Sequence, residues 1–333
     1  MIPSNSIAII GAGMAGLACA RRLADEGLPV VVYDKGRGLG GRLATRRVGD
    51  LAFDHGAQYA TARAPEFMAA LGTAAGHGHA AGWHAAWAML AEEGMTRTTV
   101  SEPRWVGAPG MGGLVRDLAA GVAVHAGIRI TSLAHAADGW RLGDADGAVH
   151  GPFRRVVLAV PAPQAMDLLG VWVDRFPALA AVRYAPCWAA LVAWPDLLPL
   201  PFDAARLDVD PVLSMAARTS GRPGRPQGGD CWVLHATPEW SRRHLEDTAD
   251  AVAPRLLDRF LTLTGVAETV LHCTAHRWRH ALVEQAAGAP FLRDEALGLA
   301  LCGDWCLGPR IELAFLSGHH LAGALLEDLV EAG

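Results

Sequence analysis

Residues 7–34 read IAIIGAGMAGLACARRLADEGLPVVVYD, and this stretch decides the fold. The apolar run Ile7 to Ile10 predicts a buried strand, the glycine turn Gly11-Ala12-Gly13-Met14-Ala15-Gly16 follows at once, and Leu17 to Leu28 has apolar residues at helical spacing. A second apolar run ends at Asp34, 23 residues beyond Gly11. In such a unit the glycines let a pyrophosphate approach the helix N-terminus, and the acid accepts a hydrogen bond from a ribose hydroxyl. The stretch therefore predicts dinucleotide binding by a Rossmann-like unit.

The rest of the predicted nucleotide-binding domain lies far along the chain. Strand signals run from Val122 to Val160, a last short strand is expected at Leu297 to Leu301, and a helix is expected from Leu313 to Leu329. The intervening segment, residues 166–287, is rich in Trp and Pro. We expect its Gly221–Pro226 loop to be mobile and to have no function.

Composition limits the classes of protein that the chain can be. Its 333 residues suffice for about two domains, and 51% hydrophobic with 19% charged residues exclude an intrinsically disordered protein. Lys and Arg number 29 against 34 Asp and Glu, giving a net charge of −5 without a basic stripe, so we expect no nucleic-acid partner. The longest apolar candidate for a membrane segment, residues 7–20, is interrupted by three glycines, so we predict no membrane association and a cytoplasmic location.

Further motifs along nearly the whole chain resemble those of bacterial renalases, within the flavin amine oxidase superfamily. They follow the glycine turn and Asp34 as Lys35-Gly36-Arg37-Gly38-Leu39-Gly40-Gly41-Arg42, Thr45-Arg46-Arg47, Phe53-Asp54-His55-Gly56-Ala57-Gln58-Tyr59, Arg104-Trp105-Val106-Gly107, Pro109-Gly110-Met111, Pro161-Ala162-Pro163-Gln164-Ala165, Trp232-Val233-Leu234-His235-Ala236-Thr237, His276-Arg277-Trp278 and Cys302-Gly303-Asp304-Trp305-Cys306-Leu307.

The resemblance implies an α/β fold with two domains. An FAD-binding, Rossmann-like domain with three ββα layers would comprise residues 1–65, 109–165 and 288–333. A smaller α+β substrate domain of the p-hydroxybenzoate hydroxylase type would comprise residues 66–108 and 166–287.

The resemblance also assigns residues to non-covalent FAD, since no cysteine matches a covalent flavin attachment motif. Asp34, with Lys35 beside it, would hold the adenosine ribose, Ile130 would offer its backbone to the adenine, and Gln58 and Tyr59 would lie by the isoalloxazine. The pyrophosphate and the ribityl and pyrimidine end would be held by Gly11, Gly13, Met14, Ala15, Gly41, Arg42, Asp304, Arg310, Ile311 and Glu312.

The implied reaction is oxidation of 2- and 6-dihydro isomers of NAD(P)H to NAD(P)+. Hydride would pass to flavin N5, and O2 would reoxidise the flavin to give hydrogen peroxide. A dihydropyridine that loses hydride becomes aromatic and leaves no proton to remove, so positioning suffices and no general base is needed.

Four side chains are candidates for the substrate side of the site: Tyr59, Trp278, His235 and His280. Strand alternation predicts that one of Trp232 and His235 points into the core. Asp54 and His55 are expected to fix the turn that follows them. The chain departs from the family pattern at Pro309, Leu313, His280 and Leu282, which leaves the substrate, and the choice between NAD and NADP, open.

No metal site is predicted. His272, His276 and His280 are spaced by four, but they fall in a segment that looks extended and does not bring ligands together. His77-x-His79 and His319-His320 are expected to be solvated or packed histidines. The six cysteines are scattered, which favours reduced, mostly buried thiols.

Two other classes of function stay open. An amine oxidase of this superfamily often keeps a lysine that holds a water at flavin N5, whereas the single lysine here, Lys35, follows the ribose-binding strand. A related desaturase or protoporphyrinogen-type oxidase would need a large apolar cavity. A non-catalytic FAD-binding redox sensor is the second alternative.

Overall fold

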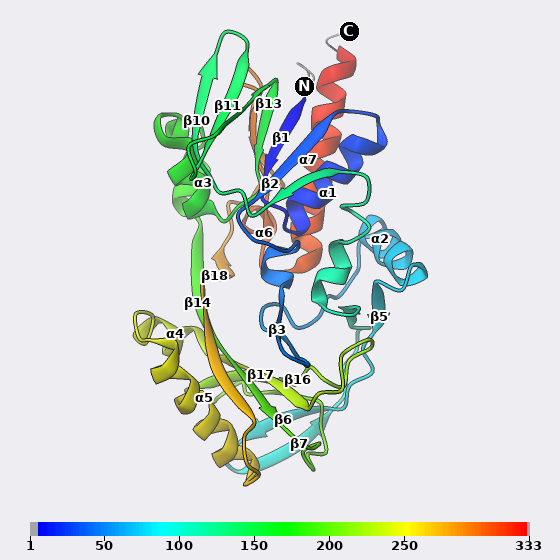
Figure 1. The fold of residues 1–333 in the computed structure, drawn as a ribbon, viewed down its shortest axis with the longest axis vertical. Coiled ribbons are helices and arrows are strands. Elements are labelled where there is room, and N and C mark those ends of the chain that lie inside the picture. Colours follow the sequence, from blue (N-terminus) through cyan, green and yellow to red (C-terminus); the bar gives the residue numbers. More distant parts are fainter. Residues whose placement is uncertain (1–5, 332–333) are drawn as a thin grey trace.

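The computed structural model describes residues 6–331, which form two lobes, each built on its own β-sheet (Figure 1). The upper lobe in Figure 1 contains a six-stranded sheet in the order β19-β20-β13-β1-β2-β9, and the lower lobe a seven-stranded sheet in the order β18-β14-β17-β16-β15-β6-β7. The first strand and the last helix of the chain both lie in the upper lobe, as the sequence predicts.

The six-stranded sheet is parallel except for β19, which pairs with β20 in the antiparallel sense at one edge. Every residue of the central strand β1 is buried, which explains its unbroken apolar sequence. The strands of this sheet are β1 (Ile7–Ile10), β2 (Val30–Asp34), β9 (Ala123–Ala126), β13 (Arg155–Leu158), β19 (Leu292–Asp294) and β20 (Leu299–Leu301).

The two faces of this sheet are covered differently. Ile7 and Ile9 of β1 pack in one core with residues of helices α1 (Met14–Asp25) and α7 (Ile311–Glu331). Ala8 and Ile10 face the opposite way and share a second core with Trp140. That core lies under a three-stranded antiparallel sheet formed by β10 (Ile130–Ala136), β11 (Gly139–Asp144) and β12 (Val149–Phe153). The predicted three-layer ββα architecture is confirmed.

Helices α1 and α7 pack with little space between their backbones. A Cβ added at Gly318 would lie 1.9 Å from the carbonyl oxygen of Ala15, so a side chain there would push the helices apart. The close approach holds the first turn of α1 against the middle of α7.

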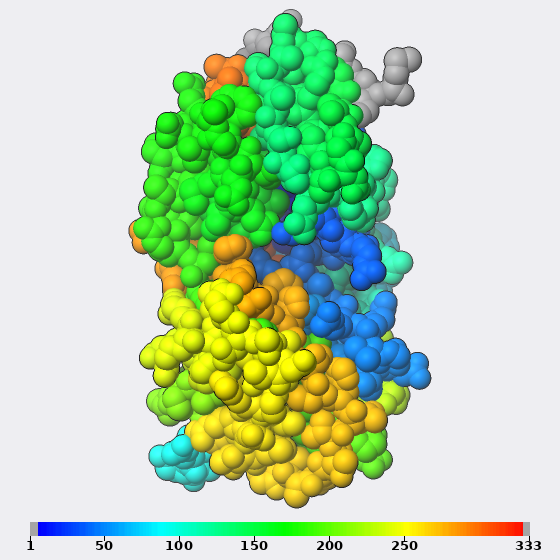
Figure 2. Space-filling model, turned by 60° about the vertical axis from the view of Figure 1, so that its left-hand side comes forward, coloured from blue at the N-terminus to red at the C-terminus, as the bar shows by residue number. Residues whose placement is uncertain are grey.

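The seven-stranded sheet has one helix-covered face and one face toward the upper lobe. Along β14, alternate residues such as Trp188 and Val192 pack with α5, whereas Ala189 and Leu191 pack with Phe53, which lies in the segment that links the two sheets. The strands and helices of this lobe are β6 (Trp87–Ala91), β7 (Gly94–Thr98), β14 (Arg183–Trp194), β15 (Ala204–Arg206), β16 (Leu213–Arg218), β17 (Asp230–Ala236), β18 (His272–Gln285), α4 (Pro238–Arg243) and α5 (Ala249–Thr264). Figure 2 shows the yellow segment that contains α4 and α5 covering the surface of this lobe beside orange β18.

The remaining elements connect the two sheets. Phe67 of α2 packs against Phe315 of α7, with ring centroids 5.2 Å apart, so α2 belongs to the core of the upper lobe. These elements are β3 (Thr45–Val48), β4 (Leu51–Asp54), α2 (Pro65–Gly76), β5 (Ala80–Gly82), β8 (Trp105–Gly107), α3 (Ala162–Leu169), α6 (Asp304–Leu307) and the 3-10 turns Gly41–Leu43, Met111–Val115, Gly170–Arg175 and Pro177–Ala181. Residues 66–108 thus contribute to both cores, and the domain limits remain a prediction.

No helix among the described residues is both long enough and apolar enough to cross a membrane. The six cysteines are free thiols, four of them buried, as their scattered positions predict.

Candidate flavin site

The glycine turn between β1 and α1 forms a cradle made of backbone. Gly11 has φ +114, and a Cβ there would lie 2.6 Å from the carbonyl oxygen of Ala159, so only glycine fits. A Cβ at Gly13, by contrast, would meet no protein atom within 4 Å. The first-turn N–H groups of α1 lack intrahelical acceptors and face this end of the helix, where the helix dipole favours an anion. The turn therefore has the space and the donors that a pyrophosphate needs.

Asp34 is held in place at the end of β2. Its carboxylate accepts hydrogen bonds from the N–H groups of Ala12 and Gly36, both at 2.6 Å. The carbonyl of Asp34 accepts from the N–H of Ile128 at 2.9 Å, which brings the chain leading to Ile130 to the same place. The residues predicted for the adenosine end of FAD are thus neighbours in space.

A second glycine turn lies against the first. The N–H of Gly40 donates to the carbonyl of Ala12 at 2.8 Å, and the positive φ angles of Gly40 (+99) and Gly41 (+56) turn the chain there. Arg42 follows directly. Its guanidinium makes two parallel 2.7 Å hydrogen bonds to the carboxylate of Asp304, 262 residues further along the chain.

Arg42 and Asp304 join both ends of the sequence at this site. Burial lowers the pKa of Arg42, but the neighbouring Asp304 carboxylate outweighs burial and raises it, so the arginine stays charged. Both groups were predicted to contact neighbouring parts of FAD. In the structure the two side chains are hydrogen-bonded to each other, so a phosphate bound at Arg42 would compete with Asp304 for the N–H donors of the guanidinium.

The N-terminus of α7 lies at the predicted pyrimidine end. The Glu312 carboxylate is buried, accepts from the N–H groups of Arg63 (2.5 Å) and Ala64 (2.7 Å), and pairs with Arg310 at 2.6 Å. Arg310 also donates to the hydroxyl of Thr61 at 3.1 Å. Because the Glu312 carboxylate is already hydrogen-bonded at the start of α2, we expect this residue to contact a ligand through its backbone N–H.

Gln58 lies at the centre of the substrate-side residues. Its amide nitrogen donates to the carbonyl oxygens of Asp54 (2.5 Å) and Gly56 (2.9 Å) and lies 3.4 Å from Nε2 of His235. The carbonyl of His55 accepts from the indole N–H of Trp278 at 2.9 Å and lies 3.3 Å from Nε2 of His235. Two of the substrate-side candidates, His235 on β17 and Trp278 on β18, therefore converge on the loop after β4 that carries Gln58.

The histidines in this group are neutral at physiological pH. Burial lowers the pKa of His235 to about 4, and burial together with His276 lowers that of His55 to about 4. Trp232, three residues before His235, is completely buried, as strand alternation predicts. His280 lies apart from the group, with its ring 5.4 Å from that of Tyr184.

Tyr59 belongs to an aromatic cluster with Trp83 and Trp87. The ring centroid of Tyr59 lies 6.3 Å from that of Trp83 and 5.6 Å from that of Trp87. The Arg104 guanidinium carbon lies 3.5 Å from the ring centroid of Trp87 and 4.5 Å from that of Tyr59. A cation is thus held against aromatic faces beside the residue predicted to meet the isoalloxazine.

Comparison with known families decides the identity of this site. Residues 9–72 match the NAD(P)-binding Rossmann-like domain family, and residues 74–326 match the flavin containing amine oxidoreductase family. The chain belongs to the flavin-containing amine oxidoreductases. FAD is therefore its cofactor, and the backbone cradle at Gly13, Asp34 and the N-terminus of α7 fit that molecule.

Solved structures share the fold of this flavin-containing amine oxidoreductase at low sequence identity. A protein from Exiguobacterium sp. 255-15, assigned as a protoporphyrinogen oxidase, has a TM-score of 0.77 at 12% identity, covering 98% of this chain and 100% of that chain. Reduced UDP-galactopyranose mutase has a TM-score of 0.75 at 11% identity (97% and 94% covered), and putrescine oxidase bound to putrescine has 0.68 at 12% (97% and 99%). At these identities the likeness concerns the fold alone.

One expectation about the loop at residues 221–226 is wrong. Arg222 and Arg225 in that loop have fully buried side chains, and both pair with the buried carboxylate of Asp54, at 2.8 and 2.6 Å. Arg222 also donates to the side-chain oxygen Oε1 of Gln58 at 2.7 Å, and Arg225 to the backbone carbonyl of Gly107 at 2.8 Å. The loop is anchored because two buried guanidiniums require a carboxylate, and Asp54 supplies it from the end of β4.

Sequence analysis gave Asp54 only the role of fixing the turn after it, and it did not foresee that Asp54 pairs with Arg222 and Arg225. Burial raises the pKa of Asp54, but Arg222 and Arg225 outweigh burial and keep it below the usual range, so the carboxylate is ionised. One negative charge faces two positive charges, which leaves a net positive charge beside Gln58. Only the spacing of two arginines between glycines and prolines hinted at this loop, and that pattern is equally typical of a solvated turn.

Proposed function

We propose that this flavin-containing amine oxidoreductase is a renalase-like oxidase that converts 2- and 6-dihydro isomers of NAD(P)H, O2 and a proton into NAD(P)+ and hydrogen peroxide. FAD, when bound, accepts the hydride at N5 and passes the electrons to O2. The observation that carries the proposal is the positive charge of the half-buried Arg104 beside Tyr59, to which the buried cluster of Asp54, Arg222 and Arg225 adds a net positive charge beside Gln58.

The charge of these arginines favours one class of substrate over another. A dinucleotide brings phosphate groups, which guanidiniums attract and bind with a planar fork of donors. An amine substrate is positively charged at neutral pH, and the same arginines repel it.

The neutral histidines are consistent with a reaction that removes no proton. With pKa values of about 4, His235 and His55 are weak proton acceptors at neutral pH. Hydride loss from a dihydropyridine needs no base, whereas amine oxidation does better with one. In this proposal Trp278, His235 and Tyr59 bind and orient the ring of the substrate, and His280 lines the side near Tyr184.

The position of Lys35 also argues against amine oxidation. The ammonium of this single lysine donates to the side chain of Gln164 at 3.0 Å, next to Asp34 at the adenosine end of the site. No lysine is therefore available beside Gln58 to hold a water at the flavin.

The decisive experiment is anaerobic mixing of the FAD-loaded protein with purified 2- and 6-dihydro-NAD(P) isomers while the flavin absorbance is followed. Rapid bleaching by these isomers, with recovery and one peroxide per flavin on admitting air, is the expected result. Ordinary 4-dihydro-NADH, putrescine and protoporphyrinogen are the comparison substrates. Bleaching by an amine or by protoporphyrinogen alone would replace the proposal with the corresponding activity, and bleaching by none of them would favour a redox sensor.

The role of Arg104 is tested by the split between KM and kcat. Arg104→Met is expected to raise KM for a dihydro-NAD isomer roughly tenfold with little change in kcat, since one charge-assisted phosphate contact is lost. An N-alkyl dihydronicotinamide without phosphate should show no such rise. Arg97→Met, at an exposed arginine of β7, is the matched control. An equal rise for both substrates would show that Arg104 does not recognise phosphate.

A further inference from the structure

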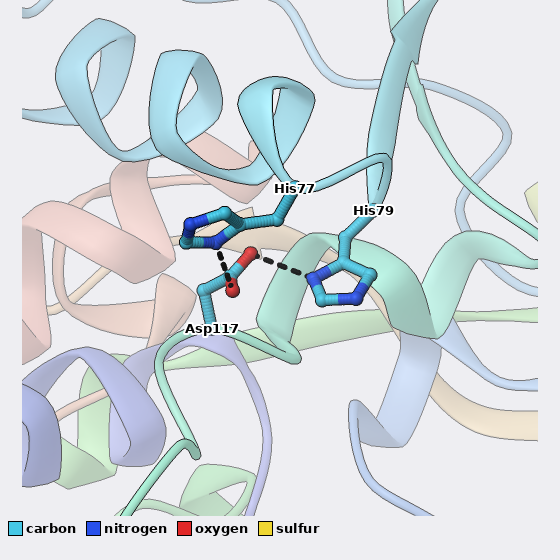
Figure 3. Close-up of side chains that lie close together, drawn as sticks. All are labelled: His77, His79 and Asp117. Carbon is cyan, nitrogen blue, oxygen red and sulfur yellow. Dashed lines mark hydrogen bonds and ion pairs between the residues drawn. The ribbon is translucent and has the colours of Figure 1, made fainter.

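Two histidines and an aspartate converge at the end of α2, away from the flavin site. Nδ1 of His77 lies 2.8 Å from one carboxylate oxygen of Asp117, and Nδ1 of His79 lies 2.9 Å from the other. Figure 3 shows both imidazole rings turned toward the same carboxylate. The three ligand atoms lie within 4.8 Å of one another, and among the described residues this is the one group of its kind.

The local backbone sets both rings on one side. His77 ends α2, and Gly78 has φ +75, so the chain reverses direction within one residue. The backbone of His79 is held from two directions, because its N–H donates to Ala74 at 2.7 Å and its carbonyl accepts from Ala108 at 2.8 Å. The position of His79 therefore does not depend on its imidazole.

Asp117 is equally well placed. It follows the 3-10 turn Met111–Val115 and precedes the buried Leu118, so its backbone is tied into the core of the upper lobe. Slight burial raises the pKa of the carboxyl, but the hydrogen bonds from His79 and His77 outweigh burial and lower it, so the group is ionised.

We propose that His77, His79 and Asp117 form a binding site for a divalent transition-metal ion, Zn²⁺ above all, that ties α2 to the Met111–Val115 turn. Two imidazole nitrogens and one carboxylate oxygen are a donor set that zinc accepts in tetrahedral geometry, with water as the fourth ligand. Zinc bonds of about 2.0–2.2 Å place neighbouring ligand atoms about 3.3 Å apart, so small side-chain movements suffice. The exposed side of His77 leaves room for the water.

The site is connected to the flavin site through a single hydrogen bond. The Met111 N–H, at the start of the tied turn, lies 3.1 Å from the carboxylate of Asp54 and donates to it. A bound ion would therefore stabilise the segment that supports Asp54 without contacting FAD or substrate.

The test is zinc titration of the FAD-loaded protein by calorimetry and by thermal denaturation. We expect one equivalent of Zn²⁺ per chain and a rise in Tm of about 4 °C at a hundredfold excess over Kd. Asp117→Asn and His79→Ala should each weaken binding by about tenfold or more, because each removes one ligand, and should abolish the Tm shift. His84→Ala, which removes an exposed histidine outside the group, is the control.

Two results would overturn the proposal. One is that the wild-type protein binds no zinc at concentrations up to about 1 mM. The other is binding that is equally tight in Asp117→Asn, His79→Ala and the control, which would place the ion elsewhere. The Tm of each metal-free variant, measured alongside, separates loss of binding from loss of fold.

Discussion

The glycine turn at Gly11–Gly16 and the ion cluster at Asp54, Arg222 and Arg225 are both buried and both lie at the flavin site, but they are built from different materials. The turn is made of backbone N–H groups and missing Cβ atoms within one short segment. The ion cluster is made of three side chains, and Arg222 and Arg225 lie 168 and 171 residues beyond Asp54 in the sequence. We therefore expect the conformation of the turn to depend on side-chain volume, and the stability of the cluster to depend on charge.

The largest expected effect tests the charge of the ion cluster. Asp54→Asn keeps the size of the side chain but leaves two buried guanidiniums without a counter-charge, and we expect a loss of about 3–5 kcal/mol in the free energy of unfolding. Urea denaturation measures it. If the loss is under 1 kcal/mol, in the range of a surface ion pair, the cluster does not hold the lobes together.

A pair of glycine substitutions tests the volume of the turn. A Cβ at Gly16 would lie 1.9 Å from the carbonyl oxygen of Gly11, whereas one at Gly13 meets no protein atom. Gly16→Ala should therefore lower the stability of the apoprotein and abolish FAD binding. Gly13→Ala should leave apoprotein stability within about 1 kcal/mol, as expected for a helix N-cap, but weaken FAD binding. Denaturation of the apoprotein and fluorescence titration with FAD distinguish the two, and equal behaviour of the variants would contradict this account of the cradle.

The pH dependence of stability sharpens the comparison, because His235 contacts Gln58 beside the ion cluster. Its pKa is lowered to about 4 in the folded protein, so between about pH 6.5 and 4 the unfolded chain binds more protons. Stability present above pH 6.5 is thus lost as the pH falls toward 4, by roughly 3 kcal/mol for this group. His235→Gln should flatten the profile of unfolding free energy in that window. An unchanged profile would assign the acid sensitivity to other groups, His55 first.

The smallest effect is expected at an exposed ion pair that resembles the cluster only in composition. Arg141 makes two 2.7 Å hydrogen bonds to Asp138 on the surface of the three-stranded sheet. Because water solvates both charges, Asp138→Asn should not shift the urea midpoint measurably. A shift comparable to that of Asp54→Asn would show that burial does not distinguish the two pairs.

Much of the nucleotide-binding half was predictable because its signals are local. The order of apolar run, glycine turn, helix and acid specifies the βαβ unit within 28 residues, residues 7–34, and the structure places β1, α1 and β2 there. The final strand and helix were expected at 297–301 and 313–329 and are found at Leu299–Leu301 and Ile311–Glu331. Helix ends shift by one or two residues because caps, and not periodicity, decide them.

The substrate half was less predictable because its contacts are long-range. Trp278 and His235 were named from motifs, but their convergence on the carbonyl of His55 depends on the pairing of β14 with β17 and β18. The 221–226 loop was misjudged because glycine and proline indicate turns, and a turn's exposure depends on what lies opposite it.

The sequence by itself determined the nucleotide-binding unit, since backbone turns and apolar periodicity depend on neighbouring residues, and the resemblance of its motifs implied the three-layer fold and the flavin family. Only the tertiary structure decided which charges meet: Arg42 with Asp304, Asp54 with Arg222 and Arg225, and Asp117 with two histidines. A buried charge must find its partner across the fold, and distance along the chain carries no information about that partner.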